Sequence, residues 1–112
     1  MKKFMVLYMA PISAMDQMMR ATPEQMKAGM AEWQKWGDKN KKAIVDMGAP
    51  LGKTKRVTPK GAMDARNELG GYTIMQGNSA DEVAKMFVGH PHFQMSPDAK
   101  IEIVEIMPMP GM

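Results

Sequence analysis

Hydrophobic and polar positions alternate differently along the chain, and each change of period marks an expected element. Residues 3–9 are apolar on both alternating faces, from Phe4 to Met9, which is typical of a strand buried on both sides. Further strands are expected at about 53–57, at 72–76 and at 100–107, with a turn at 58–61 and a polar connection at 62–70.

A long helix is expected to begin after Thr22. Pro23 suits the first helical position, and Gln25 completes a capping box with Thr22. Apolar residues follow at helical spacing, and Gly48 supplies a stop, although Gly37 and the polar residues after it weaken the middle. The expected core stripe of this helix contains Met26, Met30, Trp33, Trp36, Ile44 and Met47.

A second capping box, from Ser79 to Glu82, precedes a short helix that ends at Gly89. Its inward residues are expected to be Val83, Met86 and Phe87. The element order is therefore β-α-β-β-α-β. This order predicts an α+β, ferredoxin-like fold: one domain over residues 1–112, with a four-stranded antiparallel sheet and two helices on one face.

The other face of this sheet has no helix to cover it. Because strand 3–9 is apolar on both sides, a single copy would expose an apolar surface of the kind that marks an interface or a pocket. We expect two copies to pack sheet to sheet as a homodimer, leaving a partly apolar cavity for a small-molecule ligand. The 16 methionines suit such an adaptable surface, or else simply replace leucine in the core.

Composition excludes several classes of chemistry. The chain has no cysteine, so iron–sulfur clusters, Cys-ligated zinc and Cys nucleophiles are ruled out. It also lacks a phosphate loop, a dinucleotide glycine fingerprint and a Gly-x-Ser-x-Gly motif, and no cofactor is expected. A basic strip at 39–60 has seven basic residues against Asp46. It has no interleaved aromatics or nucleic-acid-binding motif, so a solvated face is expected rather than nucleic-acid binding.

The N-terminus imitates a signal peptide, with Lys2 and Lys3 before a short apolar run and Ser13-Ala14 as a cleavage site. The apolar run is short, and Ile12 is too large for the position three residues before the cut. No stretch approaches the length of a membrane span, so a cytoplasmic protein without membrane contact is expected.

The strongest candidate for chemistry is the pair His90 and His92, the two histidines of the chain, which are separated by Pro91. Histidine titrates near neutral pH and serves as acid, base or metal ligand. A metal site is not expected, because Asp98 and Glu102 are the only nearby oxygen ligands. A purely structural reading, with one histidine capping the helix end and the other exposed, stays open. Further candidates for substrate binding are Tyr8, Tyr72, Arg56 and Glu68.

The whole chain resembles the YCII-related (YciI-like, DGPF) proteins in the order of its short motifs. These are the opening MKKFMVLY, the turn APLG at 49–52, GGYTI at 70–74, SADE at 79–82, GHPH at 89–92 and the ending IEIVEIMPMP at 101–110. The resemblance implies a ferredoxin-like protomer in a dimeric α+β barrel, and a His–Asp pair in a cavity. One relative is similar to a dehydrochlorinase acting on a chlorinated hydroxyquinol.

This sequence departs from the family pattern at the expected catalytic histidine. The family's histidine follows the first strand, whereas no histidine occurs here before His90, so the pair is not carried over. The sequence therefore predicts a cofactor-independent lyase or isomerase acting on a small hydrophobic or aromatic substrate in the dimer cavity, with His90 and His92 as catalytic residues. The alternative is a non-catalytic small-molecule-binding or regulatory module.

Overall fold

The computed structural model describes residues 1–11, 16, 19–94 and 96–110. Ser13 and Ala14, the cleavage-site residues considered above, lie outside this part, as does much of the loop expected after the first strand. The elements in chain order are β1 (Lys2–Met9), α2 (Pro23–Lys39), the 3-10 turn η1 (Lys41–Ala43), β2 (Ile44–Asp46), β3 (Thr54–Thr58), β4 (Gly61–Ala65), β5 (Leu69–Gly77), α3 (Ala80–Lys85), the 3-10 turn η2 (Pro91–Gln94) and β6 (Lys100–Ile106).

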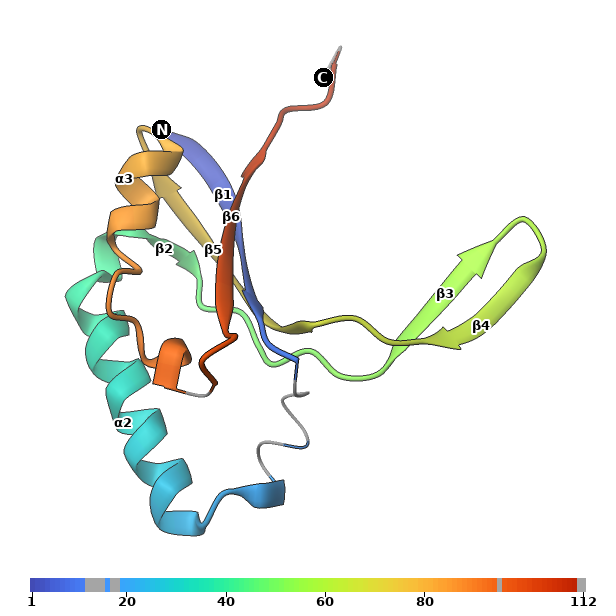
Figure 1. The fold of residues 1–112 in the computed structure, drawn as a ribbon. Coiled ribbons are helices and arrows are strands. Elements are labelled where there is room, and N and C mark those ends of the chain that lie inside the picture. The colour runs from blue at the N-terminus through green and yellow to red at the C-terminus, as the bar shows by residue number, and fades with distance from the viewer. Residues whose placement is uncertain (12–15, 17–18, 95, 111–112) are drawn as a thin grey trace.

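Four of the strands form one antiparallel sheet in the order β2-β5-β1-β6. Both helices, α2 and α3, lie on the same side of it (Figure 1). The central strand is β1, in which Val6 pairs with Thr73 of β5 and with Ile103 of β6. This is the expected ferredoxin-like α+β fold.

The two faces of the sheet differ in what covers them. On the helix side, Phe4, Val6 and Tyr8 of β1 are at most 3% exposed. The intervening residues point to the other face, because successive side chains of a strand alternate. That uncovered face is formed largely by Met5, Leu7, Tyr72, Ile74, Val104 and Ile106.

The long helix ends at Lys39, so its predicted extension to Gly48 is wrong. Asn40 closes the helix: its backbone N–H and its side-chain Nδ2 both donate to the Trp36 carbonyl, at 3.1 and 2.9 Å. Ile44 and Val45 are β-branched, and such residues favour an extended chain. They begin β2, which pairs with β5 at the edge of the sheet.

The segment predicted as the second sheet strand, 53–57, lies instead in a separate hairpin. β3 and β4 form a two-stranded sheet of their own, and the polar connection predicted at 62–70 contains β4. The place beside β5 is taken by β2, which is too short at three residues to show a strand pattern in the sequence.

The predicted methionine stripe of α2 is also partly wrong, since Met30 is 72% exposed and Met26 is exposed as well. The N-terminal half of α2 extends beyond the sheet (Figure 1), so its side chains do not reach the sheet's core. Trp33 and Trp36, nearer the C-terminal end, contact the core instead. Within the described residues, no helix is both long and apolar enough to cross a membrane.

Both hydrogen bonds of the capping box at Thr22 are present. The Gln25 N–H donates to Thr22 Oγ1 at 3.1 Å, and the Thr22 N–H donates to Gln25 Oε1 at 2.9 Å. Thr22→Ala is therefore expected to lower the unfolding free energy by about 1 kcal/mol. Urea denaturation measures this, with Lys27→Ala as an exposed control on the same helix that should cost nothing.

Candidate functional site

His90 and His92 follow α3, and both side chains are buried, at 1% and 3% exposure. The helix predicted to end at Gly89 ends at Lys85, and turns follow it, so that prediction is wrong. Gly89 has a φ of +75°, a left-handed conformation that turns the chain and brings the two histidines inward. The His90 N–H then donates to the Phe87 carbonyl at 3.1 Å. Neither histidine is exposed, so the structural reading with one exposed ring is wrong on that point.

His92 fastens this turn to the end of the sheet. Its Nε2 lies 2.9 Å from the Met9 carbonyl and 3.1 Å from the Lys100 carbonyl, so it donates to the last residue of β1 and the first of β6. Its backbone N–H donates to Nδ1 of His90 at 2.9 Å. The bonds to the two carbonyls occupy Nε2 of His92, so this nitrogen is not available to a ligand.

His90 is enclosed by four aromatic rings. Tyr8 stacks on it with ring centroids 5.3 Å apart, and Phe87 lies at 5.4 Å. Trp33 and Trp36 meet it edge to face at 4.5 and 4.6 Å. In the part of the chain that the structure describes, His90 Nε2 is the one buried side-chain polar atom without a hydrogen-bond partner.

Burial, with a smaller contribution from the neighbouring His92, lowers the pKa of His90 to about 4. The ring is therefore neutral at neutral pH. Because Nδ1 accepts the His92 N–H, the single ring proton lies on Nε2. His90 thus presents an unused N–H donor inside an apolar enclosure, where such a group costs about 1–3 kcal/mol.

Tyr8 contacts both histidines, at centroid distances of 5.3 and 5.5 Å. Its hydroxyl lies 2.8 Å from Thr73 Oγ1, which itself donates to the Met47 carbonyl at 2.9 Å. The Tyr8 hydroxyl is therefore the donor to Thr73. Burial raises the pKa of Tyr8 to about 12, so the phenol is neutral at neutral pH.

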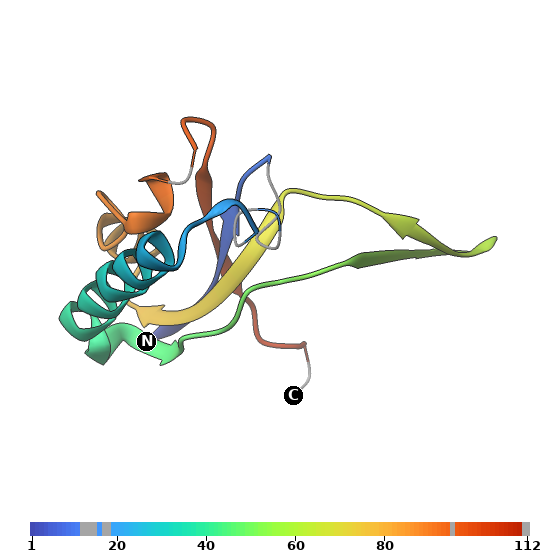
Figure 2. The same cartoon turned by 90° about the horizontal axis from the view of Figure 1, so that it is seen from below.

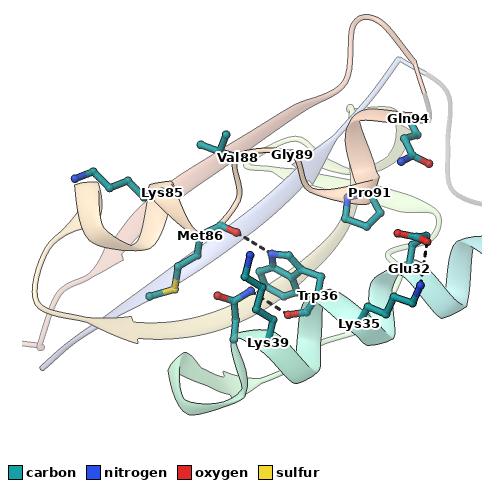
Figure 3. Close-up of a pocket in the computed structure, with 11 residues that line it drawn as sticks. Glu32, Lys35, Trp36, Lys39, Lys85, Met86, Val88, Gly89, Pro91 and Gln94 are labelled. Carbon is teal, nitrogen blue, oxygen red and sulfur yellow. Dashed lines mark hydrogen bonds and ion pairs between the residues drawn. The ribbon is translucent and has the colours of Figure 1, made fainter.

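A cavity of about 430 Å³ lies beside this cluster, between α2 and the segment from α3 to η2 (Figure 3). Trp36 stands in the middle of its lining and donates from Nε1 to the Met86 carbonyl at 2.8 Å. Gly89 and Pro91, the two neighbours of His90 in the chain, also line it. The other lining residues are Glu32, Lys35, Lys39, Asn40, Lys85, Met86, Val88 and Gln94.

The remaining predicted site residues lie elsewhere. Tyr72 is on the uncovered face of the sheet, opposite Tyr8, because it pairs with Leu7. Arg56 is exposed in β3, and Glu68 lies 4.0 Å from Lys100 at the sheet end. The structure brings together His90, His92 and Tyr8 and separates them from these three residues. The cluster lies on the helix side of the sheet, because His90 packs between Tyr8 and Trp33 and Trp36 of α2, so its expected place at a cavity between two sheets is wrong.

Trp33, Trp36 and Thr73 belong to the cluster and were not among the predicted site residues. The two tryptophans were read only as part of a core stripe, although their spacing of three positions places them on one face of a helix. Thr73 gave no signal, because a single threonine in an apolar strand is ordinary. Among the described side chains, no group of three His, Asp or Glu residues converges as a metal site would require.

No family model matches the chain, and no curated protein sequence matches it. Among solved structures, it is similar to 5-chloro-2-hydroxyhydroquinone dehydrochlorinase from Burkholderia phenoliruptrix, in complex with 2,5-dihydroxybenzoquinone. The TM-score is 0.50 and the identity 19%, with 91% of each chain covered. At this identity the likeness establishes a shared α+β fold, and it supports the resemblance to YCII-related proteins at that level.

Proposed function

We propose that the protein binds a small hydrophobic or aromatic molecule carrying an oxygen atom, and acts on it as a cofactor-independent lyase or isomerase. His90 is the central residue: Nε2 donates a hydrogen bond to the ligand oxygen. The observation that carries the proposal is this buried N–H, which has no hydrogen-bond partner among the described residues although Trp36, which packs on the His90 ring, lines a cavity. Unpaired buried donors are rare in proteins and call for a partner.

The ligand reaches His90 by way of Trp36. This tryptophan lines the cavity and also packs edge to face against the His90 ring, so its indole lies between the cavity and His90. A rotation of the indole, with loss of one hydrogen bond to the Met86 carbonyl, would join the cavity to the histidine. An aromatic ligand would replace the ring contacts that the indole gives up.

Neutral His90 suits a reaction in which negative charge develops on the ligand oxygen. A fixed donor in a water-poor enclosure stabilises an enolate-like oxygen more strongly than water does. Of the three lysines that line the cavity, Lys35 pairs with Glu32, and Lys39 and Lys85 favour the same charge. The structural relative is named as an enzyme acting on a chlorinated hydroxyhydroquinone and is bound to a dihydroxybenzoquinone, which are planar molecules of this class.

The proposal includes a homodimer formed through the uncovered face of the sheet. This face carries apolar side chains on its three longest strands, and α2 and α3 both lie on the opposite side (Figure 2). Contiguous exposed apolar surface of this kind is typical of an interface.

Non-catalytic binding is the second candidate, and one observation favours it. Tyr8 is a neutral phenol at neutral pH, and His90 carries its proton on Nε2, the nitrogen proposed to meet the ligand. Neither of these two groups therefore removes a proton from a ligand oxygen at Nε2. Ligand recovered chemically unchanged after long incubation would select this candidate.

The chain's two tryptophans both contact His90, so tryptophan fluorescence, excited selectively at a wavelength where tyrosine does not absorb, reports on this site. We expect 2,5-dihydroxybenzoquinone, hydroquinone or 4-hydroxybenzoate to change that fluorescence with saturation, and calorimetry to give the same affinity. His90→Asn keeps an acceptor near the Nδ1 position and removes the Nε2 donor, so binding should weaken about tenfold. His90→Gln restores an amide donor near Nε2 and should recover part of the affinity.

Lys55→Ala, on the hairpin far from the cavity, is the control and should bind like the unmodified protein. Equal affinity in the His90→Asn variant and the unmodified protein, with both folded, would falsify the role of His90. It would mean that the Nε2 proton points at an indole face and serves packing only.

A further inference from the structure

The β3–β4 hairpin forms an arm, defined here as residues 53–66, that leaves the body of the protein (Figures 1 and 2). Its strands pair in regular register from Thr54 with Ala65 to Thr58 with Gly61. Lys55 and Asp64 face each other across it as an ion pair. Yet every residue of the arm is exposed or only half-buried.

An arm of this kind needs a partner surface. A two-stranded hairpin alone is marginally stable in water, because it buries too little apolar surface to offset the ordering of its chain. Val57 is 77% exposed. The arm also makes the molecule extended: its radius of gyration is 15.6 Å, against about 13 Å for a compact chain of this length.

The arm leaves on the side of the sheet opposite to α2 and α3. In both views the helices lie on one side of the sheet and the arm on the other (Figures 1 and 2). The arm and the uncovered apolar face therefore border the same space. A single occupant of that space would cover both.

We propose that this occupant is a second copy of the chain, and that each arm lies along the body of the partner. The inference builds on the homodimer proposed above and adds an exchange of arms. In a two-fold dimer the same patch serves on both copies, so both arms are covered at once. Stacked sheets lie about 10 Å apart, whereas a five-residue strand spans roughly 17 Å, so the arm is long enough to pass the partner's sheet.

Charge also favours an arm-to-body contact over an arm-to-arm contact. The arm has five basic residues and one acidic residue, Asp64, a net charge of +4. Because the whole chain has a net charge of +3, the rest carries −1. Two arms repel each other, while the body of a partner attracts an arm. Glu102 of β6 is an acidic example on the uncovered face, because it pairs with Leu7 of β1.

The absence of cysteine allows a direct test. Val57→Cys is labelled with a benzophenone maleimide, isotopically light and heavy chains are mixed, and cross-linked peptides are identified by mass spectrometry after irradiation. We expect links between light and heavy chains that join the arm to the partner's sheet. Val88→Cys, 82% exposed on the helix side, is the matched control and should give no such links.

A second variant replaces the arm with a short Gly-Ser link, and sedimentation measures the dimer. We expect the dissociation constant to rise at least tenfold while circular dichroism stays that of the folded body. A dimer of unchanged affinity, or labels that link only within one chain, overturns the arm exchange and leaves the sheet-to-sheet dimer standing. A monomer at micromolar concentration overturns both, and ligand binding at His90 is measured independently of either.

Discussion

Lowering the pH from 6.5 to 4 is expected to remove about 3 kcal/mol of unfolding free energy through His90 alone. The pKa of this histidine is 6.5 in an unfolded chain and about 4 in the folded protein. Between these values the unfolded chain binds a proton that the folded protein does not. Stability therefore rises with pH through this window, is complete above pH 6.5, and stops falling below about pH 4.

The pKa of His90 is low because its ring is enclosed by apolar and aromatic side chains. A charged imidazole at this place would lie among Tyr8, Trp33, Trp36 and Phe87, none of which offers a negative charge, and next to His92. Removing a charged group from water without an opposite charge is costly. Since typical domains have only 5–15 kcal/mol of stability, a loss of about 3 kcal/mol is large.

Urea denaturation at several pH values, followed by tryptophan fluorescence, measures the profile. Carboxylates also titrate near pH 4. The informative quantity is therefore the difference in unfolding free energy between the unmodified protein and the His90→Asn variant at each pH. The variant should lose the His90-dependent part of the slope and keep the rest. Parallel profiles for the two proteins would contradict a depressed pKa at His90.

Gly48→Ala is expected to cost about 4 kcal/mol or more. Gly48 has a φ of +78°, which by itself costs a residue with a side chain about 1–2 kcal/mol. A Cβ at this position would also overlap the Tyr72 carbonyl oxygen and lie 2.6 Å from its carbon. Both are backbone atoms of the central part of the sheet, so neither can move aside cheaply.

Two other glycines distinguish the cost of backbone strain from the cost of overlap with Tyr72. Gly89 has a φ of +75° but nothing near its Cβ position, so Gly89→Ala should cost only the strain, about 1–2 kcal/mol. Gly29 is helical with open space, and Gly29→Ala should stabilise by about 0.5–1 kcal/mol. Thermal and urea denaturation rank the three variants. Equal losses at Gly48 and Gly89 would show that the contact with Tyr72 is unimportant.

Much of the fold was predictable because its signals are local. Capping residues at Thr22 and Ser79 mark both helix starts, and each accepts the expected hydrogen bond. The strand that is apolar on both faces, β1, lies inside the sheet between β5 and β6. The edge strand β2 was missed because its pairing with β5 is a contact distant in sequence, which a three-residue segment does not reveal.

Only part of the candidate cluster could be predicted from the sequence. His90, His92 and Tyr8 do meet, whereas Tyr72, Arg56 and Glu68 lie elsewhere. The sequence does not show that Trp33 and Trp36 close over His90, because that depends on where α2 ends. The stop at Asn40 depends on a side-chain bond to the Trp36 carbonyl, a detail of tertiary structure rather than of pattern.

The position of β1 has a consequence for the synthesis of the chain. Its two neighbours come late: Lys3 pairs with Gln76 and with Ile106. On the ribosome, this apolar strand emerges well before either neighbour exists, with both of its hydrogen-bonding edges open to other nascent chains. The four-stranded sheet is therefore complete only after β6 is translated, because β1 pairs with β5 and β6, the last two strands to be synthesised.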